Sequence, residues 1–143
     1  MDLPDENRPS LLRRLAAVLY DGMLLIALWM GAGAAWIALH GGNAAAPGDA
    51  FFRLYLLGVS FMFFVGFWVW GGRTLGLQAW RMRLIDANGQ KVGLVGASNR
   101  FFAALLSWLP AGAGFLWALF DRQGLTWHDR LSRTYLYLDP KRP

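Results

Sequence analysis

The sequence contains no cysteine among its 143 residues. This absence excludes a disulfide framework, a thiolate zinc or iron-sulfur site and a cysteine nucleophile. Histidine is scarce as well, with only His40 and His128, which lie far apart in the sequence. The chain also lacks a phosphate-binding loop and a nucleophile-base arrangement. We therefore expect no metal site, no cofactor and no enzymatic activity.

Charged residues are also scarce, since 16% of the residues are charged while 56% are hydrophobic. These proportions invert those of ordinary soluble proteins. The formal net charge of +5 comes from basic residues that flank apolar segments and form no single patch, which argues against nucleic acid as a partner. Eight Trp residues add an aromatic excess typical of bilayer interfaces. The composition indicates an integral membrane protein, with the lipid bilayer as its main partner.

Three apolar segments cover residues 15–39, 54–70 and 101–120. The first has only one charged residue, Asp21, and its length of about 25 residues exceeds the roughly 30 Å hydrocarbon thickness. A secretory signal peptide is the alternative for this segment, but its apolar region would be shorter. The third segment is interrupted by Pro110 and the small residues after it, so it forms either one span or two half-length helices.

Two polar regions have the alternating pattern of strands. Trp80, Met82 and Leu84 alternate with arginines, and the following Asn88-Gly89 pair suits a hairpin turn. Residues 133–139 alternate in the same way. We therefore predict a small β-hairpin between the second and third apolar segments, and a tail strand that can pair with it.

The fold class expected from these features is an α-helical membrane protein with two spanning helices, a third apolar segment broken near Pro110, a small cytoplasmic β-hairpin and a tail strand. All 143 residues form a single membrane domain. Its parts are the first span (10–40), the second span (53–71), the hairpin (74–97), the third apolar segment (99–120) and the tail (121–143).

The distribution of Lys and Arg predicts the orientation in the membrane. Basic residues are concentrated before the first span, in residues 73–100 and in the tail, whereas residues 41–50 have none. Because basic loops face the cytoplasm, the amino end and the predicted hairpin belong inside. Three full crossings would place the basic tail outside. We favour a third segment that turns back near Pro110, in a multi-pass protein of a bacterial-type inner (plasma) membrane.

Arg14 and Asp21 are seven residues apart and therefore share one face of the first helix. A carboxylate at the depth of Asp21 costs about 2.5 to 3.5 kcal/mol, which implies a partner, a proton or a cavity. The alternatives are structural pairing, handling of ions or protons, and contact with a ligand or a lipid head group.

The tail contains the densest polar cluster. Asp129 and Arg133 have the spacing of a helical surface pair, and His128 precedes Asp129. Because an arginine can bridge two carboxylates, we predict that Arg14, Asp21 and Asp129 meet as one buried cluster, with His128 peripheral to it. Asp121, His128 and Arg133 are secondary candidates.

Three motifs resemble the RDD family of prokaryotic membrane proteins. They are residues 14–21 (RLAAVLYD), residues 72–76 (GRTLG) leading into WRMRLIDANG, and residues 121–134 (DRQGLTWHDRLSRT). The resemblance covers roughly residues 10–138. It implies that the arginine and two aspartates of the family name correspond to Arg14, Asp21 and Asp129. It further implies a role in transport, with some members linked to sodium/proton exchange.

Two functions remain open from the sequence. One is a transport component that moves protons or monovalent cations through the Arg/Asp cluster, for which a single short chain would require a homo-oligomer. Small residues at positions 27, 31 and 35 could form such a helix contact, although this pattern is common. The other is a structural or accessory membrane protein in which the cluster is an internal latch between the tail and the first span.

Overall fold

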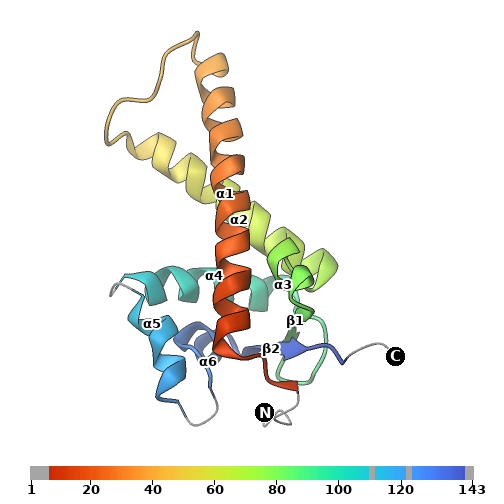
Figure 1. The fold of residues 1–143 in the computed structure, drawn as a ribbon. Coiled ribbons are helices and arrows are strands. Elements are labelled where there is room, and N and C mark those ends of the chain that lie inside the picture. The colour runs from red at the N-terminus through yellow and green to blue at the C-terminus, as the bar shows by residue number, and fades with distance from the viewer. Residues whose placement is uncertain (1–6, 110–111, 122–123, 141–143) are drawn as a thin grey trace.

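The computed structural model describes residues 7–109, 112–121 and 124–140 (Figure 1). Two long helices, α1 (Leu11–Leu39) and α2 (Ala50–Gly71), are joined by a polar loop at one end of the molecule. The side chain of Ser10 caps α1, and that of Asp49 caps α2 by accepting from two backbone N–H groups. Because of these caps, both helices begin about one turn before the apolar segments predicted from the sequence.

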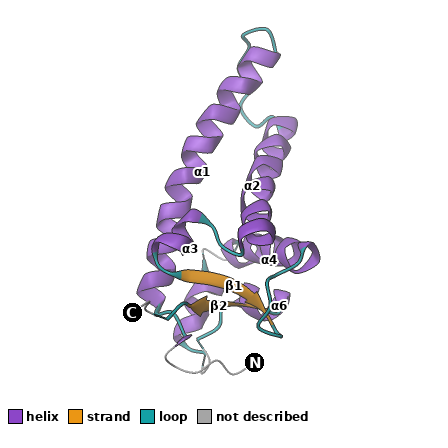
Figure 2. Cartoon of the chain, turned by 90° about the vertical axis from the view of Figure 1, so that its right-hand side faces the viewer, coloured by secondary structure: helices purple, strands orange, loops and turns teal. Residues whose placement is uncertain are grey.

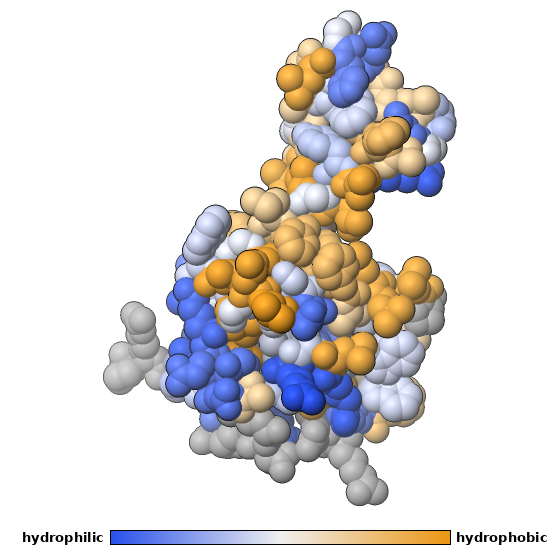
Figure 3. Space-filling model, turned by 180° about the vertical axis from the view of Figure 1, so that it is seen from behind, coloured by the Kyte–Doolittle hydropathy of each residue, from blue (hydrophilic) through white to orange (hydrophobic). Residues whose placement is uncertain are grey.

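Both helices are long and apolar enough to cross a membrane. On α1, several large apolar side chains are more than half exposed to the surroundings: Leu12, Leu19, Met23, Ile26 and Met30. On the face shown in Figure 3, apolar residues gather over the middle of the molecule, between hydrophilic ends. An apolar surface of this kind is costly in water and favourable in a bilayer, so α1 and α2 are candidate membrane-spanning helices.

The third apolar segment consists of α4 (Leu94–Trp108), α5 (Ala113–Leu116) and the 3-10 turn η2 (Trp117–Leu119). Pro110 lies outside the described residues. Helix α4 runs across α1 in Figure 1. Helix α5 packs closely on α4, since a Cβ atom added to Gly114 would lie 2.6 Å from the Cβ of Ser107.

The remaining elements are the short helices α3 (Leu75–Ala79) and α6 (Trp127–Ser132) and the strands β1 (Met82–Asp86) and β2 (Thr134–Leu138). The two strands form an antiparallel sheet in which Leu84 lies opposite Leu136. Pairing of the tail strand with the region after α2 is therefore confirmed.

The predicted hairpin is wrong in its second strand. The turn at Asn88-Gly89 is present, but only an isolated bridge between Ile85 and Lys91 follows it. The strand partner of β1 is β2 instead. Residues 75–79 are helical because Thr74 caps that turn with its side chain. The distant strand prevails because Leu84 and Leu136 share one buried core.

That core lies at the end of the molecule opposite the α1–α2 loop (Figure 2). Its most buried members are Ala17, Met82, Leu84 and Ala97. The first described residue, Asn7, lies here as well, because its side chain donates to the carbonyl of Leu138 in β2 over 3.3 Å. Asn7, β1 and the tail strand therefore share one end of the protein.

Candidate functional site

Helix α6 positions Asp129 through a capping box. The Thr126 hydroxyl accepts from the backbone N–H of Asp129 over 3.3 Å, and the Asp129 carboxylate accepts from the N–H of Thr126 over 3.0 Å. These reciprocal bonds fix the carboxylate against the first turn of α6. Its side chain has an exposed fraction of 0%.

Two arginines from other helices contact this carboxylate. Arg14 Nη1 in α1 lies 3.3 Å from Oδ2, and Arg100 Nη1 in α4 lies 2.8 Å from Oδ1. Arg14 also donates to the carbonyls of Pro9 and Gly124, while Arg100 donates to the Thr134 hydroxyl over 2.8 Å. We call these three residues the Arg14–Asp129–Arg100 cluster. It joins α1, α4 and α6, and the expected contact between Arg14 and Asp129 is present.

Charges of opposite sign keep Asp129 ionised. Burial alone would raise the pKa of Asp129, but Arg100 and its other charged neighbours lower it to about 2. Burial, reinforced by Arg100, lowers the pKa of His128 to about 3, so this imidazole is neutral at pH 7. His128 Nε2 lies 4.0 Å from Asp129 Oδ1. The cluster therefore carries one net positive charge.

Asp21 does not join this cluster. Its carboxylate accepts from the Thr74 hydroxyl over 2.5 Å and from the backbone N–H of Gly76 over 2.8 Å. Both donors lie at the beginning of α3, where backbone N–H groups have no partner within the helix. Within the described ranges, Asp21 has no ion-pair partner. The single cluster predicted for Arg14, Asp21 and Asp129 is thus divided into two separate contacts.

The contact of Asp21 explains the spacing of the GRTLG motif at residues 72–76. Gly72 ends α2 with a left-handed φ of 69°, and Thr74 caps α3. At Gly76 a Cβ atom would lie 2.4 Å from the carbonyl oxygen of Ala17 and 2.7 Å from Cγ of Asp21. Only glycine allows α3 to approach α1 this closely.

Of the three secondary candidates, His128 is buried beside Asp129, whereas Asp121 and Arg133 do not contact the buried cluster. The carboxylate of Asp121 accepts from the Leu125 N–H over 2.8 Å and pairs with Arg130. Arg133 is exposed and ends α6 with a φ of 52°. The surface pair expected between Asp129 and Arg133 does not form, because Asp129 points inward to Arg14 and Arg100.

Arg100 is the site residue that sequence reasoning missed. It was counted only as one of the basic residues that orient the chain. The available signal was its position as the only charged residue in α4. A charge in an apolar helix that packs against other helices indicates a buried partner.

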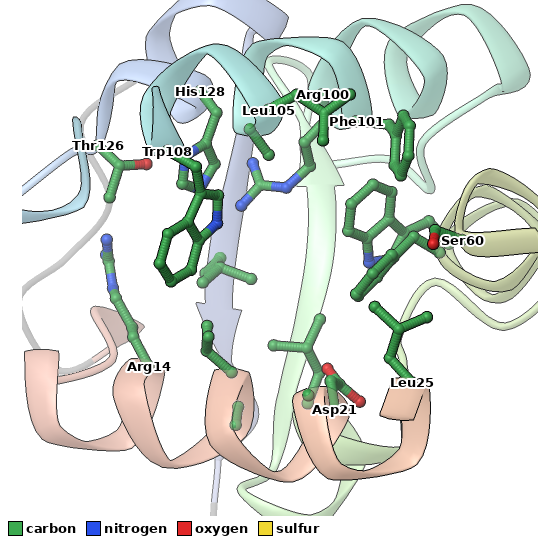
Figure 4. A pocket seen from close by; sticks show the side chains of 18 of the residues that line it. Arg14, Asp21, Leu25, Ser60, Arg100, Phe101, Leu105, Trp108, Thr126 and His128 are labelled. Carbon is green, nitrogen blue, oxygen red and sulfur yellow. The ribbon is translucent and has the colours of Figure 1, made fainter. Parts of the chain in front are cut away.

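A cavity of about 600 Å³ lies between α1, α2 and α4 (Figure 4). Its polar lining is concentrated at the end formed by Arg14, Arg100, Thr126, His128 and Asp129, with Asp21 on the wall nearby. Most of the other walls are leucine, phenylalanine and tryptophan side chains. Within the described residues, no group of His, Asp and Glu is placed to hold a metal ion.

Comparison with known proteins gives one match. The family model described as "RDD family" matches residues 8–133. No curated protein and no solved structure matches the chain. The matched residues include α1, α2, the GRTLG motif and all three members of the buried cluster. The chain therefore belongs to the RDD family, as a membrane-type protein with two candidate spanning helices.

Proposed function

We propose that this protein is a structural or accessory component of the bacterial inner (plasma) membrane, in which the Arg14–Asp129–Arg100 cluster is an internal latch. The observation that carries the proposal is the fully buried carboxylate of Asp129, with one arginine at each oxygen. Through it, α6 in the tail is tied to α1 and α4. The proposal includes no catalytic step and no cofactor.

The electrostatics of Asp129 favour a latch over a proton carrier. A group that exchanges protons works best with a pKa close to the operating pH. The pKa of Asp129 is lowered to about 2, so it stays ionised at neutral pH. Protonation of Asp129 would also remove the negative charge between two buried guanidinium groups and leave their positive charges uncompensated.

The arrangement of the ends supports a cytoplasmic amino end and tail. Asn7, β1 and β2 lie together at one end of the molecule, and the loop between α1 and α2 lies at the other. With two crossings, the basic regions all fall on one side, in agreement with the orientation of basic loops. In this topology, residues 94–119 return to the cytoplasmic side without crossing the bilayer.

Transport is the second candidate, and Asp21 is the observation that favours it. Asp21 is 6% exposed and lines the cavity between α1, α2 and α4. A cation or proton that entered the cavity would meet this group. One chain encloses little volume, so a complete route would require an oligomer.

Sealed vesicles containing the purified protein and dyes sensitive to pH and sodium distinguish the two functions. For a latch, we expect dye signals equal to those of protein-free vesicles, and a lower melting temperature for Asp129→Asn. Asp49→Asn is the matched control, because Asn also caps a helix well. Ion movement that is present in the wild type and lost in a folded Asp21→Asn variant would replace the latch with transport.

A further inference from the structure

The cavity between α1, α2 and α4 has the form of a site for an amphiphile. Its lining on α1 extends from Leu11 to Trp29, a rise of about 27 Å along the helix. The walls include Leu25, Phe101 and Leu105. Its volume of about 600 Å³ lies within the range of roughly 300 to 1,000 Å³ usual for small-molecule sites. Because the cavity is partly open, an acyl chain could enter it from the bilayer. The chain would make van der Waals contacts with wall side chains that otherwise face empty space.

At the charged end of this cavity, several guanidinium N–H donors have no hydrogen-bond partner within the described residues. Arg100 is 4% exposed, and its Nη1 serves both Thr134 and Asp129. Its Nε and Nη2 have no hydrogen-bond partner within the described residues, and the same is true of Arg14 Nη2. Figure 4 shows the Arg100 guanidinium pointing into the cavity. With Asp129 ionised and His128 neutral, the Arg14–Asp129–Arg100 cluster keeps one net positive charge.

We propose that the cavity binds an anionic phospholipid, with one acyl chain along its apolar walls and the phosphate at Arg100 and Arg14. Guanidinium groups bind phosphate oxygens with paired N–H donors. Arg14 lies about 5 Å inside the start of α1, a depth close to that of lipid head groups in the proposed orientation. The bound phosphate would neutralise the net charge of the cluster. This inference requires a membrane location but is independent of whether the protein is a latch or a transporter.

Two glycines of α1 provide a matched test. Gly22 lines the cavity, whereas Gly31 does not, and an added Cβ atom would meet nothing within 4 Å at either position. Leucine favours a helix more than glycine does, so neither Gly22→Leu nor Gly31→Leu should prevent folding. The Gly22→Leu side chain would occupy the path proposed for the acyl chain.

The full-length protein is purified in mild detergent and mixed with equal amounts of phosphatidylglycerol and phosphatidylcholine that have identical acyl chains. Mass spectrometry of the intact complex then counts the lipid that each variant retains. We expect the wild type to keep one phosphatidylglycerol, with a preference of about fivefold or more over phosphatidylcholine. Gly22→Leu should lower the retained lipid by a similar factor, and Gly31→Leu should match the wild type.

Head-group variants test the charged end. Arg100→Lys keeps the charge and loses the paired donors, so the preference for phosphatidylglycerol should fall. Arg53→Gln changes a cavity residue near the start of α2 and should leave the preference intact. If only Arg53→Gln lost the preference for phosphatidylglycerol, the head group would lie near the start of α2 instead of at Arg100 and Arg14. This result would overturn the proposal.

Three further results would also overturn it. The first is equal retention of the two lipids by the wild type. The second is displacement of the lipid by millimolar inorganic phosphate, which would assign the site to a small soluble anion. The third is a change of oligomeric state in Gly22→Leu with unchanged lipid binding, which would assign the cavity to a second copy of the chain.

Discussion

Arg14 and Arg13 are neighbours in α1 with different surroundings. Arg14 is buried and paired with Asp129, whereas Arg13 is partly exposed and has no ion-pair partner within the described residues. Removing Arg14 takes away one of the two partners of the buried Asp129 carboxylate and the hydrogen bonds to Pro9 and Gly124, so Arg14→Ala should lower the free energy of unfolding by about 3 to 5 kcal/mol. Arg13→Ala should change it by less than about 1 kcal/mol. Thermal melting in detergent measures both, and equal melting temperatures would contradict the buried latch.

His128 makes the protein sensitive to acid. Its pKa is lowered from 6.5 to about 3 in the folded state, so the unfolded chain binds a proton first as the pH falls. The contribution of neutral His128 to the free energy of unfolding should therefore be fully present above about pH 6.5 and should be lost as the pH falls from 6.5 to 3. His128→Gln cannot bind this proton and should lose about 2 to 3 kcal/mol less than the wild type between pH 6.5 and 4.5. Parallel melting curves over this window would show that His128 is not buried in its neutral form.

At the scale of elements, the approach of α3 to α1 depends on Gly76. A methyl group there would overlap the carbonyl of Ala17 and the carboxylate of Asp21. Gly76→Ala should therefore displace α3, weaken both hydrogen bonds of Asp21 and destabilise the fold by about 1 to 3 kcal/mol. Gly71→Ala is the control, since an added Cβ atom would have open space at that position. If both variants melt at the wild-type temperature, α3 is not held against α1 by this contact.

The sheet shows how distant elements replace a local pairing. Residues 82–91 contain a good turn, yet β1 pairs over its full length with β2. The side chains of Leu84 and Leu136 enter the same core as Met82 and Phe101. The apolar area buried with the tail strand therefore decides the partner of β1.

At the scale of the whole molecule, the topology has a direct test because the chain has no cysteine of its own. Asn43, Gln90 and Pro140 are exposed, and each can be replaced singly by cysteine. A membrane-impermeant thiol reagent should label Asn43→Cys in intact cells. It should label Gln90→Cys and Pro140→Cys only after the membrane is opened. Labelling of Pro140→Cys in intact cells would mean that the third apolar segment crosses the bilayer.

The sequence alone was sufficient to predict the features that depend on residues close together in the chain. Apolar runs of spanning length predicted α1 and α2, and alternation predicted a tail strand, since both patterns act over a few neighbouring residues. The charged positions Arg14 and Asp129 were also predicted as partners. That contact was expected because an arginine can bridge two carboxylates.

The tertiary structure alone decided which groups meet. Asp21 could pair with any donor near its face of α1, and the donors that reach it are the Thr74 hydroxyl and the Gly76 N–H at the beginning of α3. Arg100 took the place expected for Asp21 beside Asp129 because α4 packs against α6. The partner of a charge is chosen over distances of a few ångströms between residues far apart in the chain. The packing of whole helices sets those distances, and local sequence patterns do not contain them.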